Sequence, residues 1–206
     1  MKKKWKGPLK DFQTVSLLFF LVSCFGWVFE TAVCFYQSGE YCDRGFLSLP
    51  FCPIYGAPVC LIYYLFSRPS DGRFFHWLTS GGEKPNFRTL KKLFSVVLYF
   101  FFAATIATLA ELAVGLILES AGLSLWSYNG TPFCFMGVVC LPVSLAWGGL
   151  ISFFAQFILP PVERWLYKIP KKWKQWLNAI LWTALLADFI YNVGYYFSKG
   201  EHLEFD

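Results

Sequence analysis

The chain has 206 residues, of which 56% are hydrophobic, 21% are aromatic and only 15% are charged, and its mean hydropathy is +0.47. This composition excludes an ordinary soluble domain, in which about a quarter of the residues are charged, and predicts an integral membrane protein. The net charge of +5 does not indicate nucleic-acid binding, because the basic residues lie in separate groups between apolar segments and form no single stripe.

Apolar segments follow one another along the chain, and each is a candidate membrane helix. They cover about Thr14–Tyr36, Phe51–Phe66, Leu93–Glu119, Met136–Leu159 and Trp176–Ser198. A spanning helix needs about 20 apolar residues, and all but the second segment have that length. The second contains Pro53, Gly56 and Pro58, which predicts a broken or half-inserted helix whose backbone faces protein or a cavity. The predicted fold is therefore an all-α, polytopic transmembrane helix bundle with about five spans, formed by one integral membrane domain over residues 1–206.

The lysines and arginines orient these spans. The N-terminal tail, a loop at about residues 67–92 and a loop at about residues 160–175 hold five, six and five of the 18 basic residues, and the opposite side holds only Arg44 and Lys199. The positive-inside rule then predicts that the N-terminus and both loops are cytoplasmic and that the C-terminus is outside. Merging or dropping one span would destroy this asymmetry.

Carboxylic acids interrupt the apolar segments. Glu30, Glu111 and Asp188 lie inside three of them, and Glu119 lies at the end of the third. A carboxylate in hydrocarbon costs roughly 2.5–3.5 kcal/mol on insertion scales, so its presence there predicts a functional site. Asp188 and Asn192 are four residues apart and therefore lie on one helix face.

Under the predicted topology, the polar groups gather at the centre or on the outer side of the membrane. The candidate substrate-binding residues are Glu30, Arg44, Tyr55, Glu111, Glu119, Trp126, Tyr128 and Asp188. Such a set can form a buried ion pair, carry protons, bind a cationic group, or supply an acid and a base. It can also be a structural polar cluster that fixes helix packing, with Trp126 and Tyr128 as interfacial anchors. The residues alone leave these alternatives open.

The seven cysteines and two histidines predict no metal site or cofactor. Four cysteines fall within predicted spans, where a thiol usually acts as a small apolar side chain, namely Cys24, Cys34, Cys60 and Cys140. Cys42, Cys52 and Cys134 lie on or near the outer side, where two of them could pair in an oxidising compartment. No Cys/His spacing is typical of metal binding, and His76 and His202 are isolated.

Two stretches of the sequence echo each other. Glu30-Thr31-Ala32-Val33 is similar to Glu111-Leu112-Ala113-Val114, and each is followed by Pro-Phe-Cys, at Pro50 after 20 residues and at Pro132 after 21. Each unit is then a helix, an outer loop and a returning helix in the same orientation. This pattern predicts a parallel repeat of helix hairpins, which is common in transporters whose sites lie at the repeat interface. The identities are few, so coincidence is the alternative.

Two blocks of residues form a pair of motifs. The first block comprises Gly26-Trp27, Glu30, Arg44-Gly45-Phe46-Leu47, Pro50 and Cys52-Pro53-Ile54-Tyr55-Gly56. The second comprises Glu111, Gly115, Glu119, Trp126, Tyr128, Gly137, Cys140-Leu141, Ser144 and Trp147-Gly148. Together the blocks span roughly Ser23 to Gly149, and they resemble the ABC-transporter permease family of the CmpB type, whose members are bacterial integral membrane proteins. No motif matches beyond about Leu159. The resemblance implies a multi-pass protein of the bacterial plasma membrane.

The chain departs from the family pattern mainly in the second outer loop. Ser127 stands where the family usually has an acid, Cys134 where it often has asparagine, and Val138 near a usual basic residue. Leu49 occupies a usual glycine position in the first loop. If the second loop contacts a ligand, these changes predict a different or less polar one.

The resemblance implies a permease subunit of a membrane transporter rather than an enzyme. The sequence contains no Gly-x4-Gly-Lys-Ser/Thr nucleotide loop, so a separate ATPase would have to dock on Phe74–Lys92 or on Pro160–Gln175. The second of these segments could instead lie on the lipid surface. The alternatives are a membrane-embedded enzyme or binding protein acting on a lipid or isoprenoid, and a structural scaffold. Membrane lipid is an expected partner, a homo-oligomer is compatible with five helices, and nucleic acid is not expected.

Overall fold

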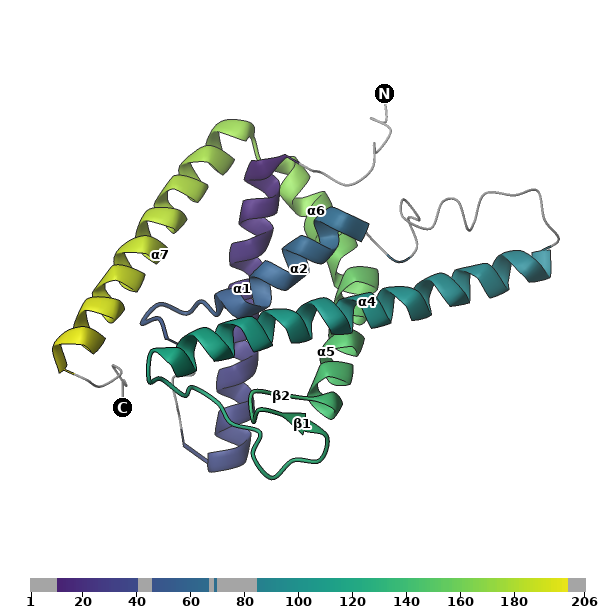
Figure 1. Ribbon diagram of the computed structural model, residues 1–206. Helices are drawn as coiled ribbons and strands as arrows, with labels where there is room; N and C mark the ends of the chain where they lie inside the picture. Colours follow the sequence, from purple (N-terminus) through teal and green to yellow (C-terminus); the bar gives the residue numbers. More distant parts are fainter. Residues whose placement is uncertain (1–10, 41–45, 67–68, 70–84, 200–206) are drawn as a thin grey trace. The chain divides into compact units, whose positions relative to one another are not determined.

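The computed structural model describes residues 11–40, 46–66, 69 and 85–199, and nearly all of them are helical (Figure 1). The elements are α1 (Phe12–Ser38), α2 (Pro53–Phe66), α4 (Pro85–Ser120), β1 (Cys134–Phe135), β2 (Val139–Cys140), α5 (Leu141–Phe153), the π-helix η1 (Phe154–Ile158), α6 (Leu159–Lys168) and α7 (Lys171–Lys199). The chain forms two compact units, Pro58–Lys168 and Phe12–Ala57 together with Ile169 onward, and each is described by itself. The all-α fold class is confirmed.

Helices long and apolar enough to cross a membrane lie where the sequence predicts them. Within the described residues there are four, at Phe12–Tyr36, Thr89–Ser120, Leu141–Lys168 and Lys171–Lys199, and α2 is a shorter apolar helix. The helices near the predicted fourth span have other bounds than that span. Helix α5 begins at Leu141, after a hairpin, and most of residues 160–175 are helical in α6 and α7.

Three helical segments pack around one apolar core in the unit Pro58–Lys168. Ile62 and Phe66 of α2 meet Tyr99, Ala103 and Ala107 of α4, and Ile151 and Ala155 join them from α5 and η1. Small side chains on α4 allow close packing, since Gly148 of α5 lies against the backbone oxygen of Phe100 and the methyl group of Ala104. Small residues at such crossings are typical of membrane helices, which gain stability from close van der Waals contact.

A short hairpin connects α4 to α5. Helix α4 ends in a Schellman motif, in which Gly122 has φ = 81° and Leu123 N donates to Leu118 O at 2.9 Å. In the hairpin, Met136 and Gly137 have φ values of 55° and 70°, and Val138 N donates to Phe135 O at 3.2 Å. Positive φ at both central residues is the requirement of a type I′ turn, which suits the twist of two antiparallel strands.

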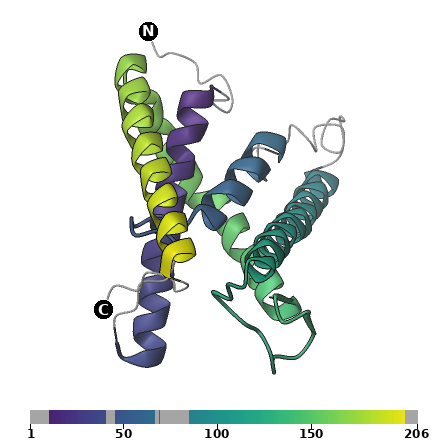
Figure 2. The same ribbon diagram turned by 60° about the vertical axis from the view of Figure 1, so that its left-hand side comes forward.

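In the unit formed by Phe12–Ala57 and Ile169 onward, α1 and α7 lie side by side and run in the same direction (Figure 2). Lys174 Nζ donates to Thr14 Oγ1 at 2.7 Å, and Trp182 Nε1 donates to Ser16 Oγ at 2.8 Å. Farther along both helices, Phe20 packs with Leu185. The contact positions rise together along the two helices, so the helices are parallel.

This parallel pair bears on the number of membrane crossings. Two neighbouring spans that run in the same direction need an odd number of crossings between them. Helices α4 and α5–α6 are long enough to supply two, so the predicted five-span topology would need α2, with its 14 residues, to supply a third. At about 1.5 Å per residue, α2 is roughly 21 Å long, which is less than the hydrocarbon thickness of about 30 Å. Five crossings would therefore require the segment before α2 to lie partly within the membrane.

The segment before α2 does pack at the middle of α1. Cys52 N donates to the backbone oxygen of Ser23 at 3.0 Å, and Ser23 lies near the centre of α1. Leu47 of the same segment belongs to an apolar cluster with Phe20 and Leu185. Irregular backbone at this depth is stable only where its N–H groups find partners within the protein, and the contacts to α1 and α7 supply them.

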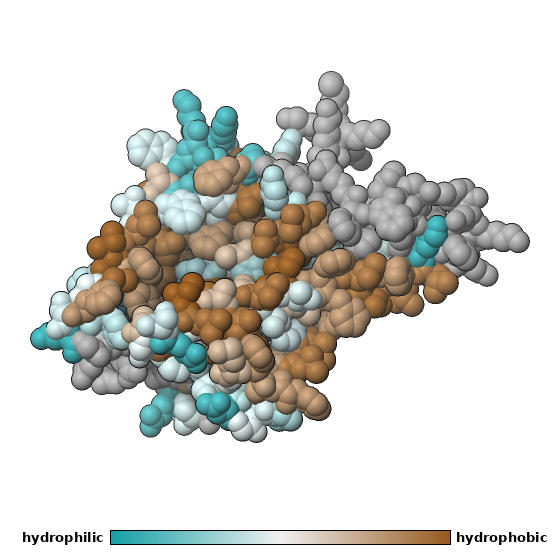
Figure 3. Space-filling view, in the orientation of Figure 1, coloured by the Kyte–Doolittle hydropathy of each residue, from teal (hydrophilic) through white to brown (hydrophobic). Residues whose placement is uncertain are grey.

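The outer faces of the long helices are apolar. Figure 3 shows hydrophobic side chains along α4 and α7, and α4 exposes Leu93, Phe101 and Leu109 at 55–61% of their surface. In water such a continuous apolar surface would be unstable, whereas lipid tails stabilise it. The exposed surface therefore agrees with a multi-pass membrane protein.

Candidate functional site

Glu111 and Tyr128 form a hydrogen-bonded pair in the unit Pro58–Lys168. The side chain of Glu111 is buried in the C-terminal half of α4, with 7% of its surface exposed. Tyr128 Oη, in the loop that follows α4, donates to Glu111 Oε1 at 2.7 Å. The loop is held in place by two bonds, from Tyr128 N to Gly137 O at 2.8 Å and from Trp126 Nε1 to Val138 O at 2.9 Å. A phenol donor stabilises the ionised form of a carboxyl group that has lost contact with water.

Glu30 and Tyr55 form the corresponding pair in the other unit. Tyr55 Oη donates to Glu30 Oε1, and both side chains are half-buried. The Tyr55 ring lies directly against Gly26, one helical turn before Glu30, where a Cβ atom would overlap the ring. The glycine therefore provides the space that brings the phenol to the carboxylate.

The two glutamate helices are crossed at equivalent positions by their returning helices. Gly56 of α2 lies on α1 at Phe19 and Ser23, and Gly148 of α5 lies on α4 at Phe100 and Ala104. The two phenylalanines are each 11 residues before their glutamate, and Ser23 and Ala104 are each seven residues before it. Each returning helix also begins after a buried cysteine, Cys52 or Cys140. These contacts agree with the predicted repeat at the glutamate helices, whereas the second returning helix begins after Cys140 and not after the Pro132-Phe133-Cys134 motif that the sequence pairs with Pro50-Phe51-Cys52.

Asp188 and Asn192 of α7 bind the segment before α2. Asp188 Oδ2 accepts a hydrogen bond from Leu49 N at 3.1 Å, and Asn192 Nδ2 donates to Ser48 Oγ at 3.0 Å. Asn192 Nδ2 also donates to Asp188 Oδ1 at 3.1 Å, which fixes the carboxylate. Asp188 thus satisfies a backbone N–H group that would otherwise lack a partner at this depth.

The other predicted site residues are placed differently. Glu119 is exposed at the end of α4 and lines a shallow hollow with Gly115, Trp126 and Val138. The indole of Trp126 lines this hollow, and its Nε1 donates a hydrogen bond to Val138 O in the hairpin. Arg44 lies outside the described residues. The structure therefore brings Glu111 together with Tyr128, and Glu30 together with Tyr55.

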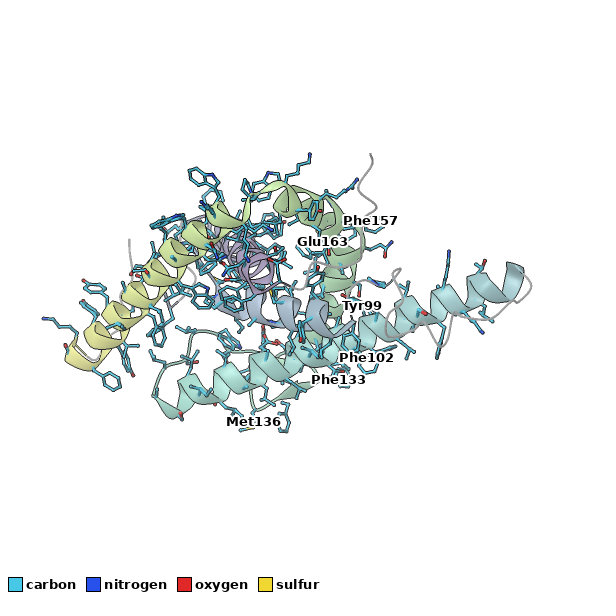
Figure 4. All side chains as sticks on the ribbon, turned by 90° about the horizontal axis from the view of Figure 1, so that it is seen from above. Tyr99, Phe102, Phe133, Met136, Phe157 and Glu163 are labelled. Carbon is cyan, nitrogen blue, oxygen red and sulfur yellow. The ribbon has the colours of Figure 1, made fainter. Side chains whose placement is uncertain are left out.

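A third glutamate–tyrosine pair was missed in the sequence. Glu163 of α6 and Tyr63 of α2 are each 2% exposed, and Tyr63 Oη donates to Glu163 Oε1 at 2.5 Å. Figure 4 labels Glu163 on α6. The signal was present in the spacing, because Leu159, Glu163 and Leu166 lie on one helix face and are all buried. A glutamate on the apolar face of an amphipathic helix predicts a buried partner.

The cysteines are arranged differently from the sequence prediction. Cys34, near the end of α1, is disulfide-bonded, so its assignment as a simple apolar side chain was wrong. Cys140 lies in β2, one residue before α5 begins, directly opposite Cys134 of β1. Among the described residues, no group of three or more His, Cys, Asp or Glu side chains could hold a metal ion.

The sequence matches one family model over most of its length. The model, described as "Putative ABC-transporter type IV", covers residues 17–193. The match extends well beyond the two motif blocks and includes Glu163 and Asp188. Comparison with curated proteins and with solved structures gave no match.

Proposed function

Because the chain belongs to the ABC-transporter type IV family, we propose that it is the membrane-spanning permease subunit of such a transporter, and that the glutamate–tyrosine pair of each unit is, by itself, a contact point for substrate. One observation carries this proposal. Glu30 and Glu111 occupy equivalent positions in the repeated helix pairs, and each accepts a phenol hydrogen bond. Carboxylates at this depth are costly, so two related occurrences are better explained by function than by packing.

The chemistry of these pairs limits the substrate. A carboxylate with a tyrosine hydroxyl favours a ligand that carries a positive charge or N–H and O–H donors. The second outer loop adds little further polarity, since it presents Ser127 and Cys134 where the family has more polar residues. We therefore expect a small cationic or hydroxyl-rich ligand with an apolar portion. Membrane lipid is the surrounding solvent, and the plasma membrane of a bacterium is the expected location.

Transport by this route needs energy from another chain. The sequence has no phosphate-binding nucleotide loop, so a separate ATPase would bind on the cytoplasmic side. Helix α6 is a candidate contact, because Arg164, Trp165 and Tyr167 are exposed while Leu159, Glu163 and Leu166 are buried.

Affinity purification of the tagged protein in mild detergent, followed by mass spectrometry, tests the partner. A stoichiometric ATPase is the expected result. Protein that co-purifies only with one enriched lipid would contradict the permease assignment and favour lipid binding or lipid chemistry.

Substitutions test the pairs themselves. Glu30→Gln and Glu111→Gln keep the side-chain shape and remove the charge, so we expect each to reduce ligand binding or transport at least tenfold. Glu40→Gln is the matched control, because Glu40 is exposed beyond the end of α1. If both variants fold and transport as well as the control, the carboxylates do not contact the substrate.

A further inference from the structure

Cys134 and Cys140 face each other across the β1–β2 ladder. They are Cα partners in the antiparallel register, and both are free thiols. Residues directly opposite in such a ladder have Cα atoms about 4.5–5.5 Å apart, and a disulfide needs Cα atoms about 4.4–6.8 Å apart. The backbone thus already holds the two cysteines at a spacing that a disulfide can bridge.

The two thiols differ in access. Cys140 is buried, with 2% of its surface exposed, whereas Cys134 is half-buried. Loss of contact with water and the neighbouring Cys140 sulfur raise the pKa of the Cys134 thiol. A raised thiol pKa lowers the thiolate fraction and slows attack on a disulfide at neutral pH, so oxidation should be faster at higher pH.

The outer side of the membrane, where we expect the two cysteines to lie, is a compartment in which a disulfide can form. The predicted topology places the segment between α4 and α5 on the outer side of the membrane. The same prediction places the C-terminal end of α1 on the outer side, and Cys34 near that end is disulfide-bonded. Structural disulfides persist only where the environment is oxidising.

We propose that Cys134 and Cys140 are a redox-active dithiol, which a disulfide oxidant on the outer side of the membrane converts into an intrachain disulfide. The Cys134 thiolate attacks the oxidant and forms a mixed disulfide, releasing one thiol. The Cys140 thiolate then attacks the Cys134 sulfur and releases the second thiol. The dithiol loses two electrons and two protons, and the oxidant disulfide is reduced to two thiols.

The dithiol is connected to the Glu111–Tyr128 pair. Cys134 Sγ donates a hydrogen bond to the backbone oxygen of Tyr128 at 3.0 Å, and Thr131 N donates to the same oxygen at 3.0 Å. Oxidation removes the S–H donor and leaves this oxygen with one bond fewer. The loop that presents Tyr128 to Glu111 is then less restrained. Only the effect of this coupling on the substrate rests on the proposed function. The disulfide itself does not depend on that function.

Peptide mapping tests the disulfide directly. The full-length protein in detergent is treated with oxidised glutathione at about pH 8, where the thiolate fraction is larger, and free thiols are then alkylated. Chymotrypsin cuts after Phe135 and separates the two cysteines. We expect a cross-linked peptide pair joining Cys134 and Cys140 in the wild type and in the control Cys60→Ser, but not in Cys140→Ser. Recovery of both cysteines alkylated, or of Cys134 joined to a different cysteine, would overturn the proposal.

Hydrogen–deuterium exchange tests the coupling. Oxidation should speed exchange at the amides around Tyr128 and Thr131 in the wild type. It should not do so in Cys134→Ser, which keeps a hydroxyl donor and cannot be oxidised there. Unchanged exchange in a fully cross-linked sample would overturn the coupling. Neither measurement requires a substrate or an ATPase, so failure of the proposed transport function would be seen separately.

Discussion

At the scale of single residues, buried carboxylates are stabilised by hydroxyl or backbone donors. Glu111 and Glu163 accept phenol hydrogen bonds, and Asp188 accepts a backbone N–H group. Donors of this kind lower the cost of a carboxylate in a medium without water. The same contact can be structural, as at Asp188, or be available to a ligand, as we propose at Glu111.

Removing one phenol hydroxyl should weaken the protein measurably. Tyr128→Phe deletes the donor to Glu111 Oε1 without changing the ring, so we expect a loss of about 1 kcal/mol. For a protein of this size, that corresponds to a fall in Tm of about 2–4 °C in detergent. Tyr191→Phe is the control, because Tyr191 is 60% exposed. Equal Tm values for the two variants would show that the hydroxyl contributes nothing to stability.

Asp188 should prove to be a structural acceptor. Asp188→Asn retains an acceptor oxygen for Leu49 N, whereas Asp188→Leu leaves that N–H group unpaired at a cost of about 1–3 kcal/mol. We therefore expect amide exchange at Leu49 to be slow in Asp188→Asn and fast in Asp188→Leu. Equally fast exchange at Leu49 in both variants would mean that the amide needs the charged carboxylate. That result would contradict a purely structural acceptor and would favour a role for Asp188 in ligand binding.

At the scale of helices, glycine determines how closely two of them approach. A Cβ atom at Gly148 would lie 2.9 Å from Ala104 Cβ and 3.0 Å from Phe100 O. The same addition at the next residue, Gly149, would lie 3.9 Å from Phe100 Cε2, which is an ordinary contact. Two adjacent glycines of one helix therefore differ sharply in what they tolerate.

Alanine substitutions at Gly148 and at Gly149 form a matched pair of variants, because only the first would bring two helices into overlap. Gly148→Ala should destabilise the protein by about 1–3 kcal/mol through overpacking. Gly149→Ala should be neutral or stabilise it by up to about 1 kcal/mol, because alanine favours the helix. Thermal unfolding in one detergent compares them. A larger loss for Gly149→Ala would mean that α4 and α5 do not cross at Gly148.

At the scale of the whole molecule, the parallel pair α1 and α7 predicts five crossings. Reporter fusions can count them. An alkaline phosphatase fused after Ser198 should be active, since the end of α7 is then outside, and one fused after Phe66 should be inactive. Green fluorescent protein at the same positions should give the opposite result. A fluorescent fusion after Ser198 would mean an even number of crossings and would contradict the parallel arrangement.

Much of this architecture could be predicted from the sequence. Apolar length gave the long helices, and the isolated acids marked Glu30 and Glu111. The sequence could not predict that Tyr128 reaches Glu111, because the loop between them has no periodicity and depends on the hairpin turn at Met136 and Gly137. Glu163 was overlooked because a charged residue near two prolines and an arginine is usually solvated, although its place on the apolar helix face was readable from the spacing.

The π-helix η1 has a consequence for how related sequences can differ in length at this point. A π-turn arises when a single residue is inserted into an α-helix, and it is stable here because Pro160 and Pro161 have no N–H group to close the preceding turn. A π-turn closes i→i+5 bonds, so its wider turn takes up one extra residue while the helix that follows keeps its facing. Deleting one residue from Phe154–Ile158 would restore an α-turn and leave Glu163 facing Tyr63. A related sequence shorter by one residue at this point should therefore keep its acid on the same helix face.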